Sequence, residues 1–298
     1  MKLALGTVQF GLPYGITNTA GQVAADEVTR ILRRARELGL EVLDTAAAYG
    51  ESERVLGRCG PDAHAFRFYT KTLPAGGAGM DADAIRRVVQ GVRDSLRNLG
   101  VERLDGLLVH HAGDLLGAGG QDLHAALLEL KAEGVIERLG VSVYSVDEAR
   151  EATKRYHVDA MQLPLNVLDQ SFASSGELAR LKQAGVEIHT RSAFLQGVLL
   201  AELLPPFLHT LAPGFARFKA VCAQAGMSQL EGSLAFLRQQ GVIDHVVVGV
   251  LDAEQLEQIA TAWHRSAAHL AFDFTACNME SLPAITPSKW PALQKEFQ

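Results

Sequence analysis

Four side chains able to donate, accept or stabilise a proton follow three apolar runs in the first part of the chain. Asp44 ends the run VLD, and Tyr49 follows five residues later, just before Gly50 and a polar segment. Lys71 ends the run FRFYTK, and His110 ends the run LDGLLVH. An apolar run that ends at a polar residue predicts a buried strand, and barrel enzymes carry their catalytic groups at the strands' carboxyl ends. The four residues are therefore candidate catalytic groups for proton transfer.

The chemistry of this set suits a tyrosine acid assisted by a lysine. An isolated phenol has a pKa of about 10 and donates a proton poorly near neutrality, unless a nearby positive charge favours its ionised form. Lys71 could supply that charge, and Asp44 could hold the ammonium in place. A lowering of the Tyr49 pKa by about two units would correspond to roughly 2.7 kcal/mol. His110 could donate a hydrogen bond to an oxygen that gains negative charge during a reaction.

Each of these residues also has a structural interpretation. Asp44, which precedes Thr45, could cap a turn, and a strand-end lysine such as Lys71 is more often a solvated charge. His110 adjoins His111, and because neighbours on a strand point to opposite faces, only one of the two can face a barrel mouth. The occurrence of four suitable residues at successive strand ends favours the catalytic interpretation.

The overall composition is that of an ordinary globular protein. The chain has 298 residues, of which 48% are hydrophobic and 21% are charged, and its formal net charge is −6. This charge gives no general attraction to nucleic acid or to an acidic membrane surface. No apolar run of 18 or more residues is present, and the N-terminal residues lack a cleavage pattern, so neither a membrane span nor a signal peptide is expected.

The spacing of cysteines and histidines predicts neither a disulfide framework nor a metal site. Cys59, Cys222 and Cys277 lie far apart and form no C-x-x-C pair, which suits a reducing compartment. We therefore expect a cytoplasmic protein whose cysteines are packing residues. The remaining histidines, such as His157 and His245, show no H-x-x-x-H or H-E-x-x-H spacing, so no metal is expected.

Hydrophobic periodicity predicts strands that alternate with helices along most of the chain. The expected strands are at 3–5, 42–44, 67–71, 105–110, 137–142, 160–163, 186–190 and 245–249. The expected helices are at 26–38, 51–58, 81–99, 122–132, 146–156, 176–183, 215–225, 228–239 and 253–263. The segments 6–22, 112–121 and 199–213 and the tail from residue 271 are expected to be loops or irregular. This alternation, without a linker and without a G-x-G-x-x-G motif after a strand, favours an α/β fold, a single-domain (β/α)8 TIM barrel over 1–298.

The pattern G-x-x-x-L-D-T-A-x-x-Y-G-x-S-E at 39–53, followed by a strand-end lysine and a strand-end histidine, resembles the aldo-keto reductase family. The resemblance runs from LALGTVQFG at 3–11 to HVVVGVLDAEQLEQI at 245–259. It implies reduction of a small aldehyde or ketone to an alcohol, with Tyr49 as proton donor, and it selects His110 over His111. The opening GTVQFGLPYGI and the segment RSAFLQGVLL are similar to a bacterial branch of the family that is associated with sugar-related pathways.

The resemblance also implies a nicotinamide cofactor that lies over the later strand ends. Two positions depart from the family pattern, because Val143 replaces an asparagine and Arg191 stands where many members have an aromatic ring. A guanidinium is planar and can stack in that ring's place. The cofactor-binding residues that the resemblance implies are Gly6, Thr7, Asp44, Ser142, Gln162, Arg191, Ser192, Phe194, Gln196, Gly197, Gly249, Gln255 and Gln258.

The adenosine end of the implied site departs most from the family. Members that bind a 2′-phosphate usually carry basic residues after the last strand, whereas this chain has Leu251 and Gln255 there, with Asp252 and Glu254 beside them. The resemblance favours NADP(H), since a helix N-terminus still attracts an anion, and the acidic residues leave NAD(H) as the alternative.

Two further expectations come from the resemblance. The C-terminal tail, 271–298, is expected to lie near the substrate pocket. The alternative to an oxidoreductase is a regulatory or sensor barrel that binds the cofactor but turns over little substrate. A metal-dependent barrel hydrolase is the third and weakest hypothesis.

Overall fold

Eight parallel strands close into a barrel in sequence order, so β1 pairs with both β2 and β8. The computed structural model describes residues 1–75 and 79–297. The strands are β1 Lys2–Gly6, β2 Val42–Asp44, β3 Arg67–Lys71, β4 Leu104–Val109, β5 Ile136–Ser142, β6 Ala160–Pro164, β7 Glu187–Arg191 and β8 His245–Gly249. The predicted (β/α)8 barrel is confirmed.

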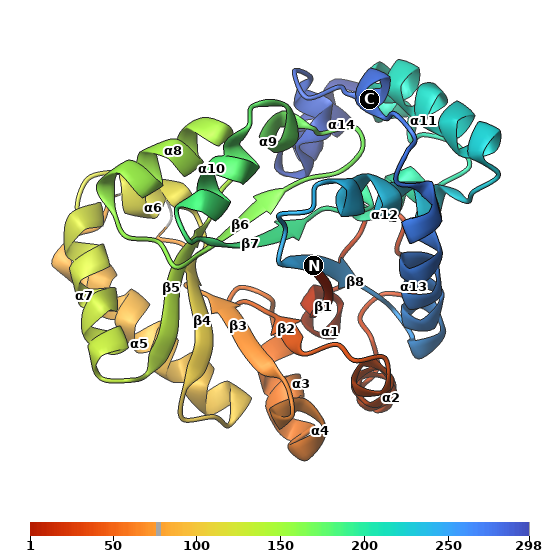
Figure 1. The fold of residues 1–298 in the computed structure, drawn as a ribbon. Coiled ribbons are helices and arrows are strands. Elements are labelled where there is room, and N and C mark those ends of the chain that lie inside the picture. Colours follow the sequence, from red (N-terminus) through yellow and green to blue (C-terminus); the bar gives the residue numbers. More distant parts are fainter. Residues whose placement is uncertain (76–78, 298) are drawn as a thin grey trace.

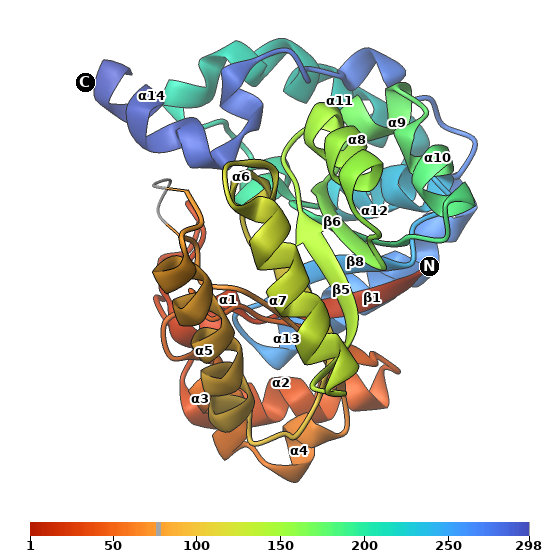
Figure 2. The same ribbon diagram turned by 90° about the vertical axis from the view of Figure 1, so that its left-hand side faces the viewer.

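Helices surround the strands (Figure 1). In the second view, the two termini lie on opposite sides of the molecule (Figure 2). The α-helices are α1 Val8–Gly11, α2 Ala25–Glu37, α3 Ser52–Arg58, α4 Pro61–His64, α5 Ala82–Leu99, α6 Ala112–Leu116, α7 Gly120–Ala132, α8 Val146–Arg155, α9 Ser171–Ser174, α10 Glu177–Gln183, α11 Ala212–Ala225, α12 Gln229–Gln239, α13 Ala253–Arg265 and α14 Trp290–Phe297. The 3-10 helices are η1 Leu195–Leu200, η2 Pro206–Leu211, η3 Ser266–His269, η4 Thr275–Cys277, η5 Pro283–Ile285 and η6 Pro287–Lys289. None of the described helices is both long and apolar enough to cross a bilayer.

The helix boundaries follow local sequence signals. The side chain of Asp81 caps α5 by accepting a hydrogen bond from the Ala84 amide, which would otherwise lack a partner. The same helix ends at Gly100, whose φ of 70° lies in the left-handed region that glycine adopts without strain. These are among the signals that made the central part of the chain predictable.

Four segments that were expected to be loops or irregular contain helices. The segment 6–22 includes α1, where Phe10 is buried in the core. The segment 112–121 includes α6, because the side chain of Leu115 is buried against the core. The segment 199–213 includes the whole of η2, which starts at Pro206, a residue that favours the first helical position. The tail includes α14, where buried Trp290 donates its indole N–H to the Ala284 carbonyl. Tertiary burial rather than periodicity orders these segments.

The end of β4 also differs from its prediction by one residue. The strand stops at Val109, because the backbone N–H of His110 donates to the Thr72 hydroxyl, at 3.1 Å, instead of continuing the sheet. The three cysteines are free, and Cys222 and Cys277 are buried. Burial raises the pKa of the Cys222 thiol to about 12 and that of Cys277 to about 11, so both stay neutral as packing residues.

The middle of the barrel is filled by a small apolar layer. Its members are Ala4, Val42, Tyr69, Leu108 and Ala160. A Cβ atom on Gly106 would lie 2.2 Å from the ring of Tyr69, so the aromatic ring occupies the space that this glycine leaves open. The layer separates the two polar ends of the barrel.

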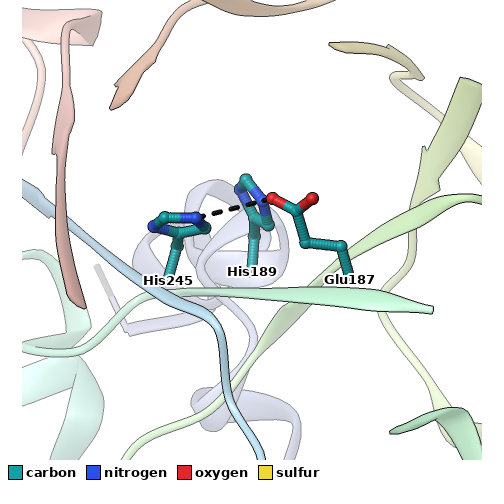
Figure 3. A group of neighbouring side chains, drawn as sticks. All are labelled: Glu187, His189 and His245. Atoms are coloured by element: carbon teal, nitrogen blue, oxygen red, sulfur yellow. Dashed lines mark hydrogen bonds and ion pairs between the residues drawn. The ribbon is translucent and has the colours of Figure 1, made fainter. Parts of the chain in front are cut away.

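A polar cluster lies at the end of the barrel where the strands begin (Figure 3). The Glu187 carboxylate is 2.8 Å from Nε2 of His189 and 3.5 Å from Nε2 of His245. The Tyr69 hydroxyl donates to the same carboxylate at 2.9 Å, and Nε of Arg138 lies 3.1 Å from its second oxygen. The two imidazoles and the carboxylate, with Tyr69 and Arg138, therefore form one network that spans β3, β5, β7 and β8.

The environment of this cluster favours a neutral imidazole and an ionised carboxylate. Burial lowers the pKa of His189, and its hydrogen bond to Glu187 only partly opposes this. Burial alone would raise the pKa of Glu187, but hydrogen bonds from His189, His245 and Tyr69 hold it well below its usual value. Both shifts make the unfolded chain bind protons more readily than the folded chain does.

We therefore predict that acid destabilises the protein partly through His189. The contribution of a neutral buried His189 is complete above the unfolded-state pKa of about 6.5 and declines below it, by up to about 2 kcal/mol at pH 5. The Glu187 contribution declines only at lower pH, below about 4.5. Thermal melting between pH 7 and pH 5 should show a smaller loss of stability for His189→Gln than for the unchanged protein. An equal loss in both proteins would contradict this assignment.

Candidate active site

A buried ion pair occupies the opposite end of the barrel, where the strands end. Asp44 and Lys71 are the last residues of neighbouring strands, and their exposed fractions are 4% and 1%. The Lys71 ammonium lies 2.9 and 2.8 Å from the two Asp44 carboxylate oxygens and donates to the Thr45 carbonyl at 2.8 Å. The Gln162 amide donates to the same carboxylate at 2.7 Å. The charges of this pair are therefore matched and hydrogen-bonded.

The loop after β2 brings Tyr49 to this ion pair. The Tyr49 hydroxyl lies 3.3 Å from the Lys71 ammonium. Close packing against α1 fixes the loop, since a Cβ atom on Gly11 would lie 1.9 Å from the Tyr49 carbonyl oxygen. Gly50, at φ 57°, turns the chain directly after the tyrosine. These two glycines hold the phenol in reach of the lysine.

Ser52 and Glu53, which end the pattern at 39–53, hold the ends of the neighbouring strands together. The hydroxyl of Ser52 is buried, contacts the hydroxyls of Thr7 and Thr45, and donates to the Thr7 carbonyl at 2.8 Å. The carboxylate of Glu53 accepts a hydrogen bond from Thr70 at 2.7 Å. Together the two residues link the ends of β1, β2 and β3.

The electrostatics of Lys71 and Tyr49 differ in one respect from the sequence expectation. Burial lowers the pKa of Lys71, but the charge of Asp44 and the interactions with Tyr49 together outweigh burial and raise it, so the lysine stays charged. Burial raises the pKa of Tyr49, and the Lys71 charge offsets only part of that rise. The expected net lowering of the phenol pKa is therefore wrong for the protein alone, because the cost of burying a phenolate exceeds the attraction of the lysine.

His110 is the fourth member of the group. Its ring lies edge-on to Tyr49, with centroids 6.0 Å apart, and it lines the cavity, whereas His111 is exposed. Burial, followed by the Lys71 charge, lowers the pKa of His110 to about 3, so the ring is neutral near pH 7. Its Nδ1 is buried and has no partner among the described residues, which favours the tautomer with the proton on Nε2. His110 is thus a neutral hydrogen-bond donor.

A cavity of about 790 Å³ opens in front of these residues. It is lined by the ends of several strands, the segment after β7 and the start of α13, together with Pro287 and Ser288 from the tail. Lys71 is the only predicted site residue outside the lining, and it lies directly behind Asp44 and Tyr49. The predicted residues that do line the cavity are Gly6, Thr7, Asp44, Tyr49, His110, Ser142, Gln162, Arg191, Ser192, Phe194, Gln196, Gly197, Gly249, Gln255 and Gln258.

Val143 and Arg191, the two residues that depart from the family's cofactor-binding pattern, contact one another. The guanidinium of Arg191 stacks on the ring of Tyr144, 4.1 Å from its centroid, and donates to the Val143 carbonyl at 3.1 Å. A cation held flat against an aromatic face is a favourable arrangement. Tyr144 therefore fixes the orientation of Arg191 at the catalytic side of the cavity.

The segment after β7 is strained where it borders the cavity. Ser192, Leu195 and Gln196 have φ values of 64°, 47° and 53°, which residues other than glycine rarely adopt. The hydroxyl of Thr17 donates to the backbone carbonyl of Gln196 at 3.2 Å. The side-chain amide of Gln196 donates to the Tyr14 hydroxyl at 3.1 Å. Strain of this kind is concentrated at ligand-binding sites.

Several cavity residues were not predicted from the sequence. Gln9 lies in the short helix α1, and Tyr14, Thr17 and Tyr144 lie in loops after strand ends, where no periodicity marks the direction of a side chain. The oxygen of the Gln9 side chain is buried without a hydrogen-bond partner among the described residues. A ligand that fills the cavity could supply that partner, so a polar ligand fits this lining.

The described residues contain one group with the chemistry of metal ligands, namely Glu187, His189 and His245. Sequence spacing did not reveal it, because its members lie on two strands that are distant in the sequence. Arg138 pairs with Glu187, and Nη2 of Arg67 lies 3.5 Å from Nε2 of His245. These cations oppose a divalent ion, so the group is better described as a hydrogen-bonded polar network.

Comparison with known proteins agrees with this geometry. The sequence model described as the Aldo/keto reductase family matches residues 2–269. The L-galactose dehydrogenase of Arabidopsis thaliana is 27% identical over 275 residues, which cover 87% of this chain and 85% of that protein.

Solved structures show the same fold. An aldo-keto reductase of Bacillus halodurans in its holo form has a TM-score of 0.69 and 20% identity, with 90% of this chain and 91% of that chain covered. An aldo/keto reductase of Klebsiella pneumoniae in complex with NADP and acetate has a TM-score of 0.64 and 22% identity, with 90% and 89% covered. The family match over nearly the whole chain shows that this protein belongs to the aldo-keto reductase family of NAD(P)-dependent oxidoreductases.

Proposed function

We propose that this protein reduces an aldehyde or ketone to an alcohol with a reduced nicotinamide dinucleotide, and that Tyr49 donates the proton. The observation that carries the proposal is the Lys71 ammonium, which is buried between the Asp44 carboxylate and the Tyr49 hydroxyl at the floor of the cavity. A buried cation beside a phenol is costly to maintain and stabilises the phenolate that remains after proton donation.

The site residues can divide the reaction between them. The bound cofactor supplies a hydride to the carbonyl carbon. The Nε2 proton of neutral His110 orients the carbonyl oxygen, and the Tyr49 hydroxyl gives its proton to that oxygen as negative charge develops. The Lys71 charge then stabilises the phenolate until a proton from solvent restores the phenol. Asp44 and Gln162 act through Lys71 by holding it in place.

The cavity residues support a nicotinamide dinucleotide as the cofactor. The lining combines strand-end glycines, the polar side chains of Ser142 and Ser192, and the unpartnered oxygen of Gln9. NADP(H) is favoured by the sequence resemblance and is present in the Klebsiella neighbour. NAD(H) remains the alternative form.

A polyhydroxylated carbonyl compound is the first substrate class to test. Two similar proteins are the L-galactose dehydrogenase of Arabidopsis thaliana and a glycerol dehydrogenase of Gluconobacter oxydans. The catalytic end of the cavity presents the polar groups of Tyr14, Tyr144 and Arg191, which suit hydroxylated substrates. A panel of sugar aldehydes and polyols, assayed in both directions, would define this class.

Replacing Tyr49 by phenylalanine should remove turnover and leave cofactor binding almost unchanged. Loss of the acid should lower kcat by about 10²- to 10⁴-fold, because the hydroxyl acts in proton transfer and not in dinucleotide binding. Steady-state kinetics and a fluorescence titration with the cofactor would measure the two effects. Tyr156→Phe is a matched control, since the Tyr156 hydroxyl contacts the Leu115 carbonyl outside the cavity.

Two outcomes of this experiment would count against the proposal. Unchanged turnover in Tyr49→Phe would exclude the tyrosine as proton donor. Tight cofactor binding by the unchanged protein, without turnover of any carbonyl compound, would favour the regulatory or sensor barrel.

The pH dependence of carbonyl reduction should be flat across neutrality. His110, with a pKa of about 3, stays neutral, and Tyr49, with a pKa above its usual value of about 10, stays protonated and able to donate. The rate of reduction should therefore fall only in strongly alkaline solution, where the phenol ionises, and alcohol oxidation should rise with pH. A decline in kcat for reduction between pH 6 and pH 8 would contradict these protonation states.

A further inference from the structure

The charge of the cavity lining is distributed unevenly. Arg191 is the single cationic side chain among the described lining residues. It lies at the catalytic end, where its charge acts on Tyr49 and His110, and its guanidinium is already held by Tyr144 and the Val143 carbonyl. A dinucleotide with its nicotinamide ring beside Tyr49 must therefore extend its adenosine end away from this cation.

Another part of the cavity is lined by neutral residues of α13 and of the connection that precedes it. They are Leu251, Gln255, Gln258 and Ile259. The Gln255 side chain accepts a hydrogen bond from the Leu251 amide through Oε1, at 3.0 Å, which leaves its NH₂ group as a donor. Carboxamides pair well with ribose hydroxyls, but they bring no charge to balance a phosphate.

The N-terminus of α13 does not compensate for the missing cations. Its amide groups would ordinarily attract an anion. Here the backbone N–H of Gln255 donates to the Asp252 carboxylate at 2.7 Å, and the backbone N–H of Ala253 donates to the Glu27 carboxylate at 2.9 Å. Two carboxylates of the chain itself thus occupy the groups that a bound phosphate would use.

Glu27 comes from a different part of the fold. It lies in the first turn of α2, which packs against α13 (Figure 1). Its side chain is largely buried, with 16% exposed, and Arg30 contacts it from a position outside the cavity lining. Glu27 and Asp252 do not line the cavity, and Glu27 is paired with Arg30, so these carboxylates act on the adenosine end by occupying the backbone amides at the start of α13.

We infer that the protein selects NAD(H) over NADP(H), and that Glu27 and Asp252 enforce the choice. The two cofactors differ only in the 2′-phosphate, which carries a charge of about −1.5 to −2 at neutral pH. Dinucleotide-binding proteins use an acidic residue near an unmodified ribose and an arginine near a 2′-phosphate. The inference rests on the proposed function and departs from the cofactor that the sequence resemblance favours.

Parallel titrations of the purified full chain with NADH and NADPH test this inference directly. The dissociation constant for NADH should be at least about tenfold lower than that for NADPH. Glu27→Gln keeps an acceptor for the Ala253 amide and removes the charge, so it should tighten NADPH about three- to tenfold and leave NADH unchanged. Adding Leu251→Arg should tighten NADPH further.

Matched controls separate local charge from net charge. Glu37→Gln removes the same charge from the far end of α2, and Leu128→Arg adds a cation on the exposed face of α7. Neither control should alter the ratio of the two dissociation constants.

The outcomes distinguish this inference from the proposed function. Equal or tighter binding of NADPH by the unchanged protein, or an equal effect of Glu27→Gln on both dinucleotides, would overturn the inference and leave the reductase function intact. Preferential NADH binding without turnover of any carbonyl compound would support the inference and overturn the proposed function alone. Binding of neither dinucleotide would overturn both.

Discussion

The ion pair between Asp44 and Lys71 is the interaction on which the candidate site depends. Burying an ammonium without a partner would shift its pKa downward and neutralise it, because a low-dielectric interior penalises charge. Here the carboxylate, the Thr45 carbonyl and the Gln162 amide together complete the hydrogen bonds of the pair. The lysine can therefore remain charged in the interior and act on the phenol of Tyr49. This arrangement needs β2, β3 and β6 at fixed positions, which only the closed barrel provides.

Strand β3 connects this site to the other end of the barrel. Alternate residues of a strand share a face, so Arg67, Tyr69 and Lys71 point in the same direction. Lys71 belongs to the catalytic end, the ring of Tyr69 fills the apolar layer, and the Tyr69 hydroxyl reaches Glu187 at the opposite end. The barrel is thus polar at both ends and apolar between them. The apolar layer keeps the Glu187 carboxylate apart from the Asp44–Lys71 pair.

The charged groups of the cavity come from separate parts of the fold. The catalytic end has the tyrosine, lysine, aspartate and histidine in contact, as the family membership leads one to expect. Arg191 stacks on Tyr144, and Glu27 is hydrogen-bonded to the start of α13. Both change the charge that a cofactor meets.

The sequence alone predicted the barrel from local signals, and its family resemblance predicted part of the cavity lining. Apolar runs ending at Asp44, Lys71 and Gly249 marked strands, and parallel strands closed in sequence order bring their ends together. The family pattern supplied the roles of the strand-end residues. Helices α6 and α14 were missed, since the burial of Leu115 and Trp290 against distant segments orders them.

Only the tertiary structure decided the contacts between residues that are distant along the chain. Glu27 lies 226 residues from Ala253, and Tyr69 lies 118 residues from Glu187, yet each pair is hydrogen-bonded. No periodicity or spacing encodes such pairs, because they arise from how packed helices and strands meet. The same holds for the net pKa of Tyr49. Its neighbouring charge could be read from the sequence, whereas the burial that outweighs this charge is a property of the folded cavity.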